Sequence, residues 1–186
     1  MSSAPPAGRE AILAQLYALF REAGVEGVSI GRIAEATGLG RSSLYHYFPG
    51  GKAEMAAAVL AFGRSWLEQE VFSPLREGSR SQRVGRMLAA VHALYDGGEQ
   101  PCLLASLLLG GGPPTLRAPL AAVLQDWLAA IAEALVQTGA EPAAAVPAAR
   151  RALASIEGGL ILARGLRDKT IFEASLEEVH HLLLHP

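Results

Sequence analysis

Apolar residues recur at helical spacing along almost the whole chain. The first such stripe predicts a helix over residues 9–23, with Ile12, Leu16, Leu19 and Phe20 on its inner face. A later stripe begins at Lys52, carries Met55, Val59, Phe62 and Trp66, and is broken at Ser73-Pro74. Further helices are expected over residues 81–95, 102–109, 116–137, 143–167 and 171–184. Because no segment convincingly alternates with a period of two residues, the predicted fold class is all-α.

Between the first two stripes, the pattern predicts two short helices joined by a glycine turn. Ser29 can cap the start of the first helix, and Ile33 lies on its apolar face. Gly38 can adopt the left-handed conformation that ends a helix. The next helix begins near Gly40, and its inward residues are Leu44 and Phe48, one turn apart. This arrangement is typical of a helix-turn-helix.

The outward face of the second short helix is polar and aromatic, as expected of a surface that enters the major groove of DNA. Arg41 is the candidate for a guanine edge, which a guanidinium can bond at two points, and small side chains beside it permit close approach. A lysine that follows two glycines at the start of the next helix is a candidate for phosphate. The predicted DNA contacts are Ser29, Arg41, Ser42, Ser43, Tyr45, His46 and Lys52.

At these positions the chain resembles the TetR family of one-component transcriptional regulators. The matching residues are Ser29-Ile30, Ile33-Ala34, Gly38-Leu39, Leu44 to Phe48 and Gly51-Lys52, with Leu19-Phe20 and Gly24 before them. Residues 48–52, 101–104 and 157–159 resemble the LmrA/YxaF-like subgroup. The resemblance implies a dimeric repressor that a small hydrophobic ligand, its inducer, releases from DNA. One departure is Gly40, where Ser or Thr is the commoner cap, so we expect a looser start of the recognition helix or one fewer phosphate contact.

The predicted organisation is a three-helix DNA-binding head followed by a helical body. Residues 1–8 are expected to be a disordered leader, and residues 9–51 form the helix-turn-helix DNA-binding domain. Residues 52–186 form the ligand-binding and dimerisation domain. The helix that starts at Lys52 would couple the head to the body.

The last two expected helices have more apolar surface than the edge of a domain usually exposes. Two such helices from each of two subunits would form a four-helix seam, and the homodimer would place its recognition helices about 34–36 Å apart, one turn of a palindromic operator. The expected interface residues are Leu153, Ile156, Gly159, Leu160, Ala163, Phe172, Leu176, Val179 and Leu183. The alternative is that both helices only complete the core of the monomer.

The body also carries an apolar and aromatic set with few polar groups, as a site for a small molecule requires. These candidate ligand-binding residues are Phe62, Trp66, His92, Tyr95, Cys102 and Trp127. Aromatic residues at helical spacing are more often packed in a core, so core packing is the alternative for each of them.

Composition changes this picture little. The chain has 186 residues, is 51% hydrophobic and has a formal net charge of −2, so no general basic field attracts nucleic acid. Positive charge is local, since residues 38–53 contain Arg41 and Lys52 and no acid. A single cysteine excludes an internal disulfide and fits the cytoplasm. The longest apolar run, residues 102–109, is shorter than the roughly 18 residues of a membrane span, so no membrane partner is expected.

Two patterns invite an enzymatic interpretation. Residues 27–31 match G-x-S-x-G, but that nucleophile motif requires a preceding strand and an α/β sheet. His181 and His185 with Glu177 have metal-ligand spacing, yet they lie at the chain end without a fourth ligand. We therefore expect no enzyme activity, metal or cofactor. The rival hypothesis is an all-helical small-molecule-binding protein or enzyme without DNA-binding activity.

Overall fold

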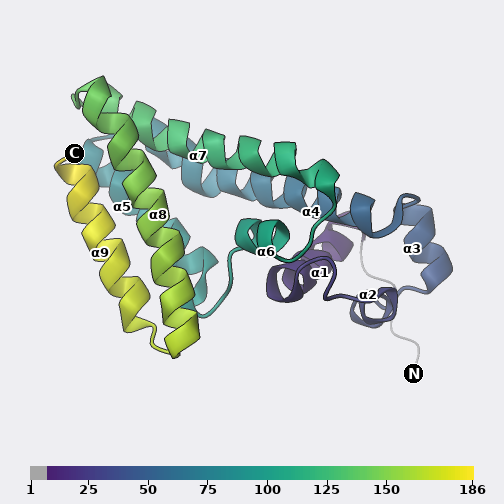
Figure 1. The fold of residues 1–186 in the computed structure, drawn as a ribbon. Helices are drawn as coiled ribbons and strands as arrows, with labels where there is room; N and C mark the ends of the chain where they lie inside the picture. The colour runs from purple at the N-terminus through teal and green to yellow at the C-terminus, as the bar shows by residue number, and fades with distance from the viewer. Residues whose placement is uncertain (1–7) are drawn as a thin grey trace. The chain divides into compact units, whose positions relative to one another are not determined.

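Helices make up most of the chain in this computed structural model, which describes residues 8–186 (Figure 1). The α-helices are α1 (Gly8–Ala23), α2 (Ile30–Thr37), α3 (Arg41–Tyr47), α4 (Gly51–Leu67), α5 (Arg80–Leu94), α6 (Leu103–Leu109), α7 (Arg117–Gln137), α8 (Pro142–Leu166) and α9 (Thr170–Leu184). No strand occurs among the described residues, so the all-α prediction is confirmed. The expected leader lies outside the described residues except for Gly8, which begins α1.

The chain divides into two compact units. Within the described residues, unit 1 contains residues 8–64 and 103–120, and unit 2 contains residues 65–102 and 121–186. Unit 1 therefore extends beyond the expected head of residues 9–51. The reason is that α6 packs on α1, where the Ser106 hydroxyl donates to the Arg21 carbonyl at 2.6 Å.

The core of unit 1 begins with α1, whose inward face the apolar pattern predicts. Ile12, Leu16 and Phe20 are all fully buried. At the end of α1, the backbone approaches α6 so closely that a Cβ on Gly24 would lie 3.1 Å from the Gly110 Cα, and Gly24 has a φ of +65°. Glycine is required there by both the conformation and the space.

Unit 2 is organised around α8 and α9, which lie side by side and antiparallel in Figure 1. Arg80, at the start of α5, ties the ends of two other helices together. Its guanidinium donates to the Thr138 carbonyl at 2.9 Å, after α7, and to the Leu184 carbonyl at 3.1 Å, at the end of α9. The last carbonyls of a helix have no partner within the helix, so this single cation satisfies orphan acceptors from both.

One helical stretch is longer and more apolar than the sequence pattern suggests. Pro114–Gln137 spans 24 residues and is apolar enough to cross a membrane by length and composition alone. The charged residues within it interrupt any continuous apolar run, although its mean hydropathy stays at 1.4. The core helix of a soluble protein passes the same test, so this is weak evidence for a membrane span.

Glycines on α8 and α5 give a matched test of packing in unit 2. A Cβ on Gly159 would fall on the Ser175 side chain of α9, whereas a Cβ on Gly85 meets nothing within 4 Å. We expect Gly159→Ala to lower the free energy of unfolding by about 1–3 kcal/mol through overpacking. Gly85→Ala should raise it by about 0.5–1 kcal/mol through helix propensity. Urea unfolding of both variants measures the difference, and equal stabilities would contradict the packing of α8 on α9.

Candidate nucleic-acid interface

The first helix of the helix-turn-helix has the caps that the sequence predicts. Ser29 is the N-cap of α2 with extended backbone, and its hydroxyl accepts a hydrogen bond from the Arg32 amide at 3.1 Å. Gly38 ends the helix in the left-handed conformation with a φ of 66°. The Thr37 hydroxyl donates to the Ile33 carbonyl at 2.7 Å. Both predicted caps are confirmed, and they fix the direction in which the chain enters α3.

The recognition helix α3 is anchored by the buried side chains on its inner face, and no side chain caps its start. Leu44 and Phe48 are fully buried, and the Arg9 guanidinium lies over the Phe48 ring at 5.6 Å from its centre. Gly40 is the N-cap of α3 and provides no side-chain hydrogen bond, as expected from its missing side chain. The start of α3 therefore presents backbone amides that no cap side chain satisfies.

The outer face of α3 is fully available to a partner. The exposed residues of this face are Arg41, Ser42, Ser43, Tyr45, His46 and Tyr47. Tyr47 was not among the expected contacts, although its side chain is 40% exposed. Arg32 on α2 is another exposed residue that was not among them. Its position on α2, about 100° around the helix from the buried Ile33, is the signal that could have identified it as exposed.

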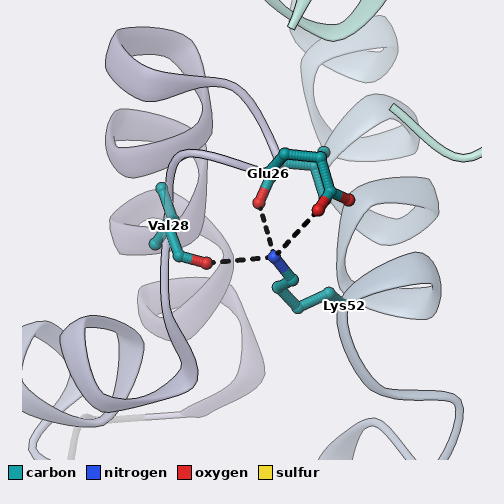
Figure 2. Close-up of polar contacts among 4 residues, drawn as sticks. Glu26, Val28 and Lys52 are labelled. Atoms are coloured by element: carbon teal, nitrogen blue, oxygen red, sulfur yellow. Dashed lines mark hydrogen bonds and ion pairs between the residues drawn. The ribbon is translucent and has the colours of Figure 1, made fainter. Parts of the chain in front are cut away.

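Lys52, a predicted phosphate contact, makes three contacts within the protein. Its Nζ donates to the carbonyls of Val25 at 2.9 Å and Val28 at 3.2 Å, and it lies 3.8 Å from a Glu26 carboxylate oxygen (Figure 2). An ammonium group has three N–H donors, of which the two carbonyls engage two, while the Glu26 oxygen at 3.8 Å adds an ion-pair contact beyond hydrogen-bond distance. The lysine thus ties the start of α4 to the connection between α1 and α2. The sequence spacing shows that Lys52 begins a helix but cannot show that its side chain turns back toward this connection.

This arrangement predicts that Lys52 matters for stability. We expect Lys52→Met to lower the free energy of unfolding by about 1–3 kcal/mol, because two carbonyls lose a charged donor. Glu26→Gln should change it by less than about 1 kcal/mol, since this partner is 66% exposed and the ion pair is screened by solvent. Chemical unfolding measures both. A Lys52→Met variant as stable as the original chain, with a salt dependence of DNA binding reduced by about one phosphate contact, would instead restore the phosphate role.

The six candidate ligand-binding residues differ in burial. Tyr95, Cys102 and Trp127 are buried, with exposed fractions of 1%, 4% and 0%, and all three belong to unit 2. Phe62 and Trp66 on α4 are half-buried. His92 is exposed and is not part of an apolar interior. The inward face of α5 includes Val91, and the next position on a helix points about 100° away from it.

A buried carboxyl group on α8 lies next to two of these residues and was not predicted as a site. The side chains of Tyr95 and Cys102 hydrogen-bond to Glu157. Burial raises the pKa of Glu157 above its usual value, and these two hydrogen bonds oppose the rise. Because the folded-state pKa is above the unfolded one, stability falls as the pH rises from the unfolded-state pKa through the folded-state pKa. In the sequence, the signal that could have identified this residue is a glutamate, Glu157, among the apolar positions of an expected helix.

The expected dimer residues lie inside one chain. All nine are buried: Leu153, Ile156, Gly159, Leu160, Ala163, Phe172, Leu176, Val179 and Leu183. Leu176 has the largest exposed fraction of the eight that have a side chain, and it is only 8% exposed. These stripes pack α8 and α9 against each other and against their own unit. In the single chain these side chains are therefore already covered, as in the alternative in which both helices complete the core of the monomer.

Both parts of the chain match families of known proteins. Residues 12–59 match "Bacterial regulatory proteins, tetR family", and residues 82–178 match "Transcriptional regulator LmrA/YxaF-like, C-terminal domain". The second match alone covers more than half of the chain. The chain belongs to the TetR family. The resemblance that the sequence pattern indicated, including the LmrA/YxaF-like subgroup, is confirmed.

Relatives of this TetR-family chain agree over nearly its whole length. An HTH-type transcriptional regulator of Mycobacterium tuberculosis is 28% identical over 95% of this chain and 94% of its own. LmrA of Bacillus subtilis, an HTH-type transcriptional regulator, is 25% identical over 87% of this chain and 89% of its own length. The solved structure of a TetR transcriptional regulator from Legionella pneumophila has a TM-score of 0.85 at 20% identity, covering 94% of this chain and 97% of its own.

These findings establish the general function of the TetR-family chain. It is a transcriptional regulator with a helix-turn-helix domain, and it is not an enzyme. Among the described residues no group of three or more His, Cys, Asp or Glu side chains is placed to hold a metal ion. The Ser29 hydroxyl, the would-be nucleophile of G-x-S-x-G, caps α2 instead.

Proposed function

We propose that this regulator is a cytoplasmic, dimeric repressor that a small hydrophobic ligand releases from a palindromic operator. The observation that carries the DNA-binding part is the exposed polar face of α3, held in place by buried Leu44 and Phe48. In this proposal Arg41 reads a base edge, and Ser42 and Ser43 allow close approach to the groove. Tyr45, His46 and Ser29 contact the sugar-phosphate backbone, which positions the helix without reading sequence.

The subunit interface that we propose is the outer face of α8. Its exposed or half-exposed residues at helical spacing are Ala154, Gly158, Ile161, Leu162, Gly165 and Leu166. Ile161, Leu162 and Leu166 are 59%, 55% and 67% exposed in the single chain. The two glycines allow a second helix to approach closely, and an apolar surface of this kind favours burial against a second copy. A two-fold dimer would present two copies of α3 to two operator half-sites.

The ligand site that we propose lies in unit 2 and includes Trp66, Tyr95, Cys102 and Trp127. Trp127 is fully buried and its ring lies 6.3 Å from that of Phe72. Its indole nitrogen is buried without a hydrogen-bond partner among the described residues. Buried aromatic surface with few polar groups suits an apolar or aromatic ligand.

The switch that we propose uses α4, the helix that belongs to both units. Residues 51–64 of α4 lie in unit 1 and residues 65–67 in unit 2, where the chain continues as a π-helix, Glu68–Phe72. Short π-helical turns within helices often occur at functional sites. A ligand that favours one position of α4 would select the dimer conformation whose spacing of α3 helices does not fit the operator.

Binding to duplex DNA from upstream of the protein's own gene tests the repressor function. We expect tight binding whose logarithm falls linearly with the logarithm of salt concentration, with a slope of roughly −0.9 per phosphate contact. An unrelated duplex of the same length is the control. If both duplexes bind with equal affinity at every salt concentration, the regulator has no operator in that region, and a repressor role there is contradicted.

A further inference from the structure

Unit 2 holds a half-buried carboxyl group, Glu157, whose Oε1 atom is fully buried. Glu157 lies on α8 between Ile156, which is fully buried, and Leu160, which is 2% exposed. Tyr95 and Cys102, whose side chains hydrogen-bond to the Glu157 carboxyl, are themselves 1% and 4% exposed. A buried ionised carboxylate is costly unless hydrogen bonds and an opposite charge compensate it.

The compensation that these neighbours provide is incomplete. Both hydrogen-bond partners of Glu157 are neutral side chains, so neither contributes an opposite charge. The Oε1 atom of Glu157 is buried and has no hydrogen-bond partner among the described residues. A carboxylate accepts several hydrogen bonds, so one oxygen remains available as an acceptor. Burial raises the pKa of Glu157, in agreement with this lack of a counter-charge.

Two of the residues around Glu157 belong to the proposed ligand site. Tyr95 packs its ring edge-on against Phe172 at 5.9 Å, and Cys102 precedes α6. A polar group at such a place, where it costs stability, is typical of a binding function. A hydrophobic ligand that entered beside Tyr95 and Cys102 would meet one strong acceptor without a charged partner.

We propose that Glu157 is the polar contact for the ligand, and that the ligand is a protonated amine on an aromatic or apolar frame. The ammonium group would donate a hydrogen bond to Oε1 and provide the missing opposite charge, while Tyr95 and Cys102 keep their bonds to the carboxyl. Charge-assisted hydrogen bonds are the stronger ones, above all away from water. This inference rests on the proposed ligand-responsive function and names the chemical class that the site would recognise.

Calorimetric titration with three probes that share one aromatic frame tests the proposal: naphthylmethylamine, naphthylmethanol and naphthoic acid. The full-length chain should bind the amine roughly tenfold or more tightly than the alcohol, since a charged donor replaces a neutral one. It should bind the acid most weakly, because two carboxylates would face each other. Equal affinity for the amine and the alcohol, or no detectable binding of the amine, would overturn the proposal.

Variants of Glu157 decide whether this carboxyl is responsible for the preference. Glu157→Gln keeps the shape and can still accept from Tyr95, and it should remove the preference for the amine. Glu157→Asp keeps the charge on a shorter side chain and should retain part of the preference for the amine. Glu133→Gln, on the exposed part of α7, is the matched control and should behave like the original chain. Circular dichroism establishes that each variant is folded, and a preference that persists in folded Glu157→Gln contradicts the assignment.

A DNA-release assay separates this inference from the function on which it rests. If naphthylmethylamine binds through Glu157 and weakens operator binding, both stand. If it binds through Glu157 while operator affinity stays unchanged, the amine site stands and the proposed induction by this site is wrong. If naphthylmethanol releases DNA at the same concentration as naphthylmethylamine, and both do so equally well in folded Glu157→Gln, induction stands and the amine preference is wrong.

Discussion

Arg41→Ala is expected to weaken binding to the cognate operator by about 1–3 kcal/mol and to relax its sequence selectivity. Arg41 is the first residue of α3 and is exposed, so its guanidinium is free to enter the groove at the end where a recognition helix reads bases. Removing a contact to a base edge lowers affinity for the correct base more than for other bases. Binding to the operator and to variants with one changed base pair, at one salt concentration, measures the effect.

The control for this substitution is Arg117→Ala. Arg117 is also exposed and begins α7, so the variant removes the same charge at another helix start. It should leave operator affinity and selectivity unchanged within about 0.5 kcal/mol. If Arg41→Ala loses affinity equally for every duplex, Arg41 contacts phosphate rather than a base. Unchanged binding in both variants would remove α3 from the interface altogether.

The sequence predicts most of the helix-turn-helix because its signals are local. A serine cap, a glycine in the left-handed region and an apolar pair at i, i+4 each act within a few residues. Ser29, Gly38 and the Leu44–Phe48 pair accordingly lie where the pattern predicts. The missing cap at Gly40 follows from the same local reasoning.

Lys52 shows where local reasoning ends. Its place after two glycines at a helix start is correct, but a lysine side chain has several rotatable bonds and a wide reach. The carbonyls of Val25 and Val28, more than twenty positions earlier in the chain, decide where its ammonium lies. Only the tertiary arrangement brings these acceptors to it. The contacts that a charge near the DNA-binding motif makes within the protein therefore follow from the tertiary arrangement and not from the motif alone.

Helical periodicity predicted the stripes on α8 and α9 but not their partner. A buried stripe has the same sequence whether it packs within one chain or between two chains. Because α8 packs against α9, the strongest stripes are used inside the chain, and the weaker stripe with Gly158, Ile161 and Leu162 faces outward. Similarly, apolar periodicity placed His92 with the aromatic residues of the body, although it lies beside the buried face of α5 and not on it.

Two adjacent residues of α8 should give opposite outcomes if its outer face forms the dimer. Leu160 is 2% exposed and Ile161 is 59% exposed in the single chain. Leu160→Glu should unfold the protein or lower its stability by at least about 3 kcal/mol, because the charge is buried without a partner. Ile161→Glu should leave the chain folded but shift it to monomer, since two carboxylates would meet across the interface.

Sedimentation at micromolar concentration and circular dichroism together distinguish these outcomes. The original chain should sediment as a dimer, and folded Ile161→Glu should sediment as a monomer that binds the operator far more weakly, because its two recognition helices are no longer joined. Glu178→Gln, at an exposed position of α9, is a control that should remain a dimer. If Ile161→Glu is folded and still dimeric, the interface lies elsewhere on the chain. A monomeric original chain at this concentration would overturn the proposed dimer.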